Sequence, residues 1–120
     1  MSNKSKAKGT RAESSIVKYL VSHGIKAERR ALHGKADIGD ILVNDELVIE
    51  VKAGQQTAAP SRTQMTEWLN QTIVEGENCG SPAVLCVVRD RRKIEDAEIW
   101  IPEGGELKFM YLDKWIETLG

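Results

Sequence analysis

Glu50 and Lys52 are two residues apart in the segment NDELVIEVKAG, residues 44–54. Side chains of a β-strand alternate between its faces, so these two charged groups share one face while Ile49 and Val51 lie on the other. A charged face can simply be the solvated side of a half-buried strand. A carboxylate beside an ammonium group can also hold a metal ion and stabilise negative charge that develops on a phosphate.

The strand that pairs with this segment decides between the two interpretations. Residues 41–43 and 47–52 are β-type runs separated by three polar residues, which is a hairpin signal. A three-residue loop places Asp40 opposite Glu50, with their Cβ atoms about 4.5–5.5 Å apart. Two carboxylates so placed are unfavourable unless a cation lies between them. A divalent ion such as Mg²⁺ fits this position.

The loop length also leaves a second aspartate open. A two-residue loop shifts the pairing by one, turns Asp40 to the other face and brings Asp37 to the carboxylate face. The three-residue loop keeps the apolar residues of both strands on one buried face. We therefore favour Asp40 and keep Asp37 as the alternative.

The remaining pattern predicts one α/β domain in which helices flank a mixed central β-sheet. Thr10 to Glu13 and Ser61 to Gln64 have the spacing of capping boxes, so each glutamate or glutamine has a purely structural explanation beside a functional one. A stripe of apolar residues predicts that the second helix ends near Gly76. In the order αβββαβββα, the expected elements are 11–23, 25–32, 41–43, 47–52, 61–76, 82–89, 97–102, 107–112 and 113–119.

Charge is distributed unevenly along the 120 residues. The net charge is −1, but residues 1–35 contain nine basic and two acidic residues, which can mark a phosphate-binding side. We expect a flexible basic tail over residues 1–8 and a single domain over residues 9–120. The two cysteines lack metal-type spacing, and no apolar run approaches 18 residues, so a soluble, cytoplasmic protein is expected.

Together, these segments resemble the restriction-endonuclease-like nucleases of the PD-(D/E)xK class, and among them the small Holliday-junction resolvases of archaea and phages. The order and spacing of several short segments carry the resemblance, which covers residues 8–90. They are KGTRAE (8–13), RR (29–30), GDI (39–41), IEVK (49–52) and QMTEWL (64–69).

The resemblance implies a restriction-endonuclease-like fold and a metal-dependent endodeoxyribonuclease that resolves four-way DNA junctions as a homodimer. It assigns Mg²⁺, with Mn²⁺ as a substitute, to Asp40, Glu50, the Val51 carbonyl oxygen and Glu13. Lys52 becomes the catalytic lysine, and Gln64 is a further candidate. In a phage-encoded protein the location is the host cytoplasm. The candidate DNA-binding residues are Lys8, Arg11, Arg29, Arg30, His33 and Lys35.

Two other functions fit the same residues. One is a nuclease of the same class that acts on flaps, nicks or duplex sites, and the other is a non-catalytic DNA-binding protein of the same fold. The turn RDRRK, residues 89–93, is a solvated turn or, beside the active face, a phosphate-contacting segment. Trp115, Ile116 and Leu119 could contribute to a dimer interface.

Overall fold

The computed structural model describes residues 3–30, 40–103 and 105–119, with side chains from Arg11 onward in these ranges. Over these residues the chain forms one six-stranded sheet, in the spatial order β1 to β6, with three α-helices. The predicted order αβββαβββα is confirmed. The elements are α1 (Asn3–Ser22), β1 (Ala27–Arg29), β2 (Ile41–Val43), β3 (Leu47–Ala53), η1 (Gln55–Thr57), α2 (Arg62–Cys79), β4 (Ala83–Val88), η2 (Ile94–Asp96), β5 (Glu98–Glu103), β6 (Glu106–Tyr111) and α3 (Leu112–Leu119).

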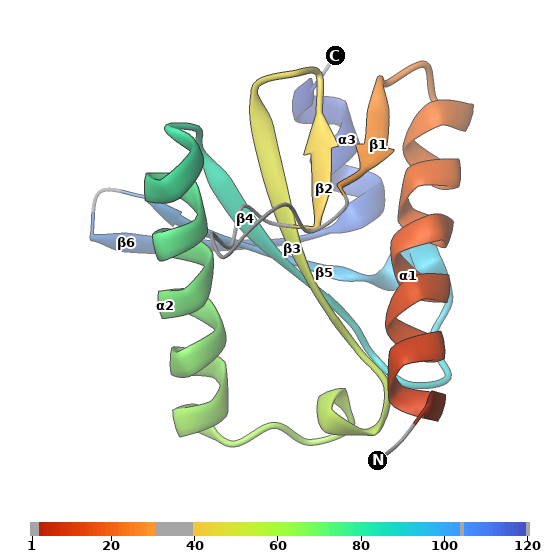
Figure 1. Ribbon diagram of the computed structural model, residues 1–120, viewed down its shortest axis with the longest axis vertical. Coiled ribbons are helices and arrows are strands. Elements are labelled where there is room, and N and C mark those ends of the chain that lie inside the picture. Colours follow the sequence, from red (N-terminus) through yellow and green to blue (C-terminus); the bar gives the residue numbers. More distant parts are fainter. Residues whose placement is uncertain (1–2, 31–39, 104, 120) are drawn as a thin grey trace.

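The sheet is mixed, as expected. Strands β3 and β4 are parallel, and α2 connects them; the other neighbouring strands are antiparallel. Helices α1 and α3 pack on one face of the sheet, where Ile16, Leu20 and Trp115 join the main hydrophobic core. Helix α2 covers the opposite face, where Trp68 packs on Leu85 and Val87 of β4. In Figure 1 the two long helices therefore stand on either side of β3.

Helix α2 changes the environment of β3. We expected one buried face, yet Val48 and Glu50, on the other face, are also buried, at 0% and 4% exposure. The reason is that α2 lies over them, so β3 is sandwiched between helices as a central strand of an α/β sheet usually is. Glu50 is thus not part of a solvated charged face.

The hairpin between β2 and β3 has the predicted register. Ile41 pairs with Ile49, and the loop turns through Asn44 and Asp45, whose φ angles are 53° and 59°. Asparagine and aspartate tolerate this left-handed conformation better than other residues with a Cβ, which suits them to a tight hairpin turn. The local sequence therefore fixes which residue of β2 faces which residue of β3.

Three expectations about the helices are wrong. Helix α1 begins at Asn3 instead of residue 11, because the lysine- and alanine-rich start has high helix propensity, so Thr10 and Glu13 do not form an N-terminal capping box. Helix α2 continues past Gly76 and ends at Cys79, with Gly80 in the left-handed conformation. Trp115 is in the core, at 3% exposure, and cannot line a dimer interface.

A glycine is needed at position 76, inside α2, because the chain beyond the helix folds back against this position. A Cβ at this position would be 2.9 Å from the Ser81 carbonyl oxygen and 3.1 Å from the Ala83 Cβ. The position therefore requires a residue without a side chain, although glycine lowers the intrinsic stability of a helix.

Gly76→Ala should therefore destabilise the protein by about 1–3 kcal/mol, because overpacking outweighs the gain in helix propensity. Urea denaturation measures this change, with Glu77→Ala, at an exposed position of the same helix, as the matched control. A Gly76→Ala variant as stable as the wild type would contradict the close packing.

Candidate active site

Asp40 and Glu50 come together across the β2–β3 hairpin. Asp40 directly precedes β2, where its backbone N–H donates to the Ile49 carbonyl oxygen at 3.0 Å, and its side chain is hydrogen-bonded to that of Glu50. Asp40 Oδ2 also accepts a hydrogen bond from the Val51 backbone N–H, at 2.8 Å. The backbone N–H of Arg30 donates to the Asp40 carbonyl oxygen, at 2.9 Å, which joins β1 to the same point.

Glu50 is held in a buried, charged environment. Burial first, and then the negative charge of Asp40, raise the pKa of Glu50 to about 7. Lys52 Nζ is 3.1 Å from Glu50 Oε2, and the lysine side chain is 18% exposed. The lysine is therefore on the carboxylate side of β3, as the strand alternation predicted, and reaches the surface where Glu50 does not.

Glu13 reaches the same group of acids from α1. Its Oε1 is 3.1 Å from Arg29 Nε, so Arg29 of β1 is fixed beside it. Burial and the charge of Asp40 raise the pKa of Glu13, while Arg29 acts in the opposite direction. Since Glu13 is in the middle of α1 and not at its start, its helix-capping explanation fails, and its proximity to Asp40 is the finding that remains.

Glu75 is an acidic residue beside the site that sequence reasoning missed. It is fully buried in α2, its Oε1 accepts a hydrogen bond from Gln71 at 3.2 Å, and its side chain is hydrogen-bonded to Glu50. A signal was present in the sequence, because Glu75 is seven residues after Trp68 and so shares the buried side of the helix. Helix α2 thus contributes a carboxyl group to the surroundings of Glu50.

The remaining candidates have different positions. Arg11 is exposed on α1. At the start of α2, Ser61 Oγ accepts a hydrogen bond from the Gln64 backbone N–H, at 3.1 Å, so the predicted cap at Ser61 is present. Gln64 is eleven residues before Glu75 in α2, which is roughly 16 Å along the helix axis, so it is far along the helix from the residue that is hydrogen-bonded to Glu50. His33, Lys35, Asp37 and the side chain of Lys8 lie outside the described residues.

The acids fit a divalent cation in type and charge. Burial is the larger cause of the raised pKa of Glu13 and of Glu50, and the negative charge of Asp40 adds to it in both, as expected for acids that lie close to Asp40. Oxygen ligands of this kind are what Mg²⁺ and Mn²⁺ take up. Among the described residues, however, no three His, Cys, Asp or Glu side chains are already arranged as a metal cage, and Glu50 contacts Lys52 instead.

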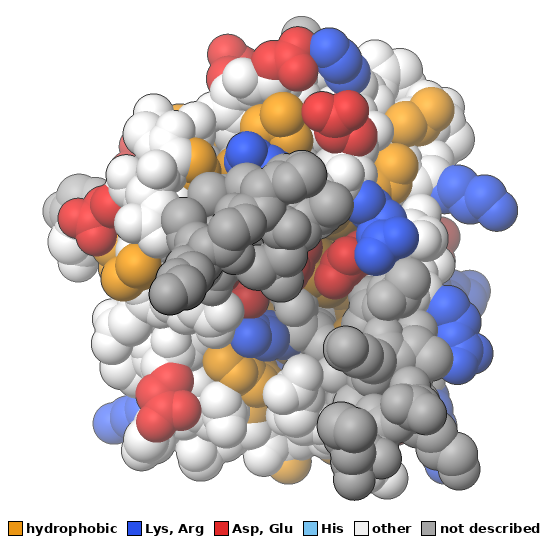
Figure 2. All heavy atoms as spheres, in the orientation of Figure 1, with side chains coloured by type: hydrophobic (Ala, Val, Ile, Leu, Met, Phe, Trp, Pro, Cys, Tyr) orange, Lys and Arg blue, Asp and Glu red, His pale blue; other side chains and the backbone are white. Residues whose placement is uncertain are grey.

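The surface around the site carries charge of both signs. Figure 2 shows several Lys and Arg side chains on the side of the molecule formed by α1 and β1, with Asp and Glu side chains beside them. None of the described helices is both long and apolar enough to cross a membrane.

Comparison with known proteins supports the fold but gives no sequence family. No family model and no curated protein matches the chain. Among solved structures, it is similar to Hjc, a Holliday junction resolvase from Archaeoglobus fulgidus, with a TM-score of 0.54 and 19% identity over 93% of each chain. It is also similar to the alkaline exonuclease LHK-Exo of Laribacter hongkongensis, with a TM-score of 0.50 and 19% identity over 98% of this chain and 66% of the exonuclease. The chain therefore has the restriction-endonuclease-like α/β fold that its sequence motifs led us to expect.

Proposed function

We propose that the protein is a Mg²⁺-dependent endonuclease that hydrolyses phosphodiester bonds in branched DNA, with the four-way junction as its substrate. The observation that carries this proposal is the meeting of Asp40 and Glu50 across the hairpin with Lys52 Nζ 3.1 Å from Glu50. Two acids that repel each other beside a partly exposed lysine are suited to a site that binds a cation and a phosphate together.

Each residue has a defined role in this proposal. Asp40, Glu50, Glu13 and the Val51 carbonyl oxygen would hold the cation, which when bound polarises the phosphate and makes a water molecule more acidic. Lys52 donates hydrogen bonds to the phosphate oxygen on which negative charge develops during attack. Glu75 and the Val51 N–H orient Glu50 and Asp40 respectively, so that both carboxyl groups face the same point.

A four-way junction as the substrate is supported by the sequence resemblance and by the likeness to Hjc over nearly the full length of both chains. A junction is cut in two strands, which favours a two-fold symmetric homodimer. Exposed apolar side chains on two elements offer surface for it, now that Trp115 is excluded. They are Ile73 and Val74 on α2, and Leu107, Phe109 and Tyr111 on β6.

Lys52→Ala and Glu50→Ala should each abolish cleavage of a labelled four-way junction in Mg²⁺, with a loss of at least about a hundredfold in rate. The first removes the ammonium group that stabilises charge on the phosphate, and the second removes a ligand of the cation. Gel analysis of junction and linear duplex, in Mg²⁺ and in EDTA, measures this rate and the substrate preference. Lys114→Ala, on the exposed side of α3, should cut normally.

The outcomes of this assay separate the alternatives. Preferential cutting of linear DNA would show that the substrate of the nuclease is a DNA other than the four-way junction. Binding without any metal-dependent cutting would leave a non-catalytic DNA-binding protein.

Asp40→Asn should abolish junction cleavage while Asp37→Asn leaves most of it, because Asp40 is the aspartate that contacts Glu50 across the hairpin. Both substitutions remove one carboxylate from the same segment, so each is the control for the other. Loss of activity in Asp37→Asn alone would show that the metal ligand is Asp37 and not Asp40.

Glu50→Gln should make the stability of the metal-free protein less dependent on pH. The folded state keeps the Glu50 proton up to a pKa of about 7, whereas the ordinary value is 4.5, so wild-type stability falls as the pH rises through this interval. The contribution is at most about 3 kcal/mol. Urea denaturation between pH 4 and pH 8 measures it, at roughly half-unit steps.

Mg²⁺ added at pH 8 should raise the Tm of the wild type and raise it less in Glu50→Gln, since an ion that binds only the folded state stabilises it. Equal pH profiles for the two proteins, and equal responses to Mg²⁺, would show that Glu50 is not part of a cation site.

A further inference from the structure

The turn that follows β4, residues 89–92 and here called the arginine turn, has an unusual backbone. The Arg92 N–H donates to the Arg89 carbonyl oxygen, at 3.2 Å, and Arg91 has a φ angle of 65°. A left-handed conformation costs a residue with a Cβ about 1 kcal/mol or more, and glycine or asparagine usually takes such positions. An arginine persists here because the surrounding structure determines the turn.

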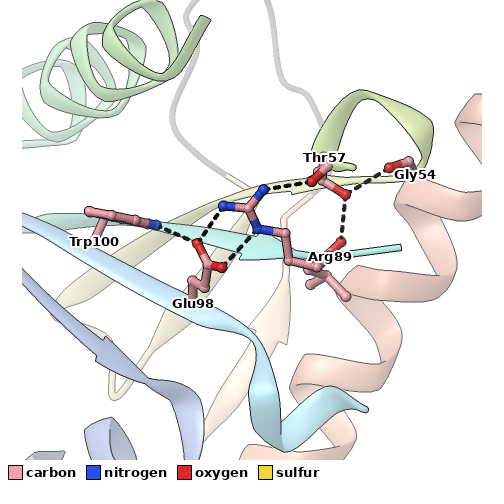
Figure 3. A network of polar contacts seen from close by, with 6 residues as sticks. Gly54, Thr57, Arg89, Glu98 and Trp100 are labelled. Carbon is pink, nitrogen blue, oxygen red and sulfur yellow. Dashed lines mark hydrogen bonds and ion pairs between the residues drawn. The ribbon is translucent and has the colours of Figure 1, made fainter. Parts of the chain in front are cut away.

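Arg89 fixes the start of the turn. Its Nε and Nη2 donate to the two carboxylate oxygens of Glu98, at 2.8 and 3.2 Å, and its Nη1 donates to the Thr57 carbonyl oxygen, at 2.8 Å (Figure 3). Trp100, two residues further along β5, donates from Nε1 to Glu98 Oε1, at 3.1 Å, and helps to hold the carboxylate. The guanidinium of Arg89 is therefore used to hold the structure together.

Thr57 connects Arg89 to the end of β3, the strand that carries Glu50 and Lys52. Its side chain is fully buried, and its hydroxyl is 2.7 Å from the Gly54 carbonyl oxygen and 3.1 Å from that of Val88 (Figure 3). Gly54 directly follows β3, and Val88 directly precedes the arginine turn. The position of the turn is thus fixed relative to the strand that carries Glu50 and Lys52.

The arginine turn lines a hollow of about 390 Å³ together with α1 and the end of β3. Four arginines line it, and Asp90 is the one acidic residue among the lining residues. A larger hollow on the other side of the turn, about 790 Å³, is lined by Arg89 to Arg92 but also by Asp96 and Glu98, so its charges balance. The smaller hollow is the one with an excess of positive charge.

This hollow lies at the end of β3, the strand that carries Glu50 and Lys52. Ala53 lines it on the face of β3 opposite to Glu50 and Lys52, and Arg11 and Ser15 line it from the side of α1 that points away from Glu13. Arg11, Arg91 and Arg92 come from two elements and are exposed. These three side chains therefore offer an anion site that is separate from the catalytic carboxylates.

We propose that Arg11, Arg91 and Arg92 bind a backbone phosphate of the DNA away from the phosphate that is cut, in the hollow between α1 and the arginine turn. The choice of DNA as the polyanion rests on the proposed function, whereas the anion site itself rests on the charge and shape of the hollow. Because the network around Arg89 fixes the turn in advance, little conformational freedom is lost on binding. Arginine is suited to this role because its planar guanidinium matches phosphate oxygens.

The experiment measures DNA binding apart from cutting. Fluorescence anisotropy in EDTA gives the Kd of the full chain for a labelled four-way junction and a labelled duplex, over salt concentrations from about 50 to 200 mM. Arg91→Gly removes the guanidinium and relieves the left-handed strain, and Arg92→Gln removes a charge without changing the backbone. Lys114→Gln, an exposed charge on α3, is the matched control, and thermal unfolding checks that every variant is folded.

We expect Arg91→Gly and Arg92→Gln each to raise the Kd about tenfold at low salt for both DNAs and to lower the slope of log K against log salt by about one. Their cleavage at saturating junction should stay close to wild type, with the loss confined to KM, because the contact is the same in substrate and transition state. Lys114→Gln should change neither quantity.

Two results are decisive and distinguish this site from the proposed function. If both arginine variants bind DNA with the Kd and salt slope of Lys114→Gln, the phosphate site is wrong, even if the protein cuts the junction in Mg²⁺. The phosphate site is also wrong if the wild type binds no DNA. If the wild type never cuts DNA in Mg²⁺ but the arginine variants lose affinity as expected, the phosphate site stands and the nuclease proposal fails.

Discussion

Two carboxyl groups held against each other across a hairpin are the feature on which the rest of this structure depends. Asp40 and Glu50 are brought together by backbone pairing, and burial under α2 leaves Glu50 little water to screen its charge. Burial first, and then the negative charge of Asp40, raise the pKa of Glu50 to about 7. An arrangement of this kind is unfavourable for folding alone, and it becomes favourable when a cation, a proton or Lys52 neutralises part of the charge.

The fold places these groups through elements that serve different purposes. The hairpin turn sets the register, α1 contributes Glu13 and the basic surface, and α2 buries Glu50 and adds Glu75. The parallel strand β4 then carries the chain to the arginine turn, next to the end of β3. The site and the proposed phosphate contact are therefore connected through the central strand pair.

Local sequence was sufficient to predict the hairpin. The polar loop of three residues and the apolar alternation on both sides allow one register that buries the apolar residues, and this register predicts that Asp40 lies beside Glu50. The element order followed from periodicity for the same reason. Lys52 needed only the alternation of side chains along a strand.

Other features depend on contacts that local sequence does not contain. The spacing from Trp68 puts Glu75 on the buried side of α2, but a glutamate on a helix is normally exposed, and its burial depends on the packing of α2 on β3. Gly76 was taken as a helix end because the close approach of Ser81 and Ala83 is a tertiary contact. The sequence does not predict the hydrogen bonds of Arg89 either, since its partners, Thr57 and Glu98, are on other elements.

The most direct test of the central idea is a calorimetric titration of Mn²⁺ into the protein without DNA. We predict heat of binding in the wild type, a large loss of affinity in both Asp40→Asn and Glu50→Gln, and a double variant no weaker than either single one, because the two carboxylates share an ion. Unchanged Mn²⁺ affinity in the single variants, or additive losses from independent sites, would contradict the account.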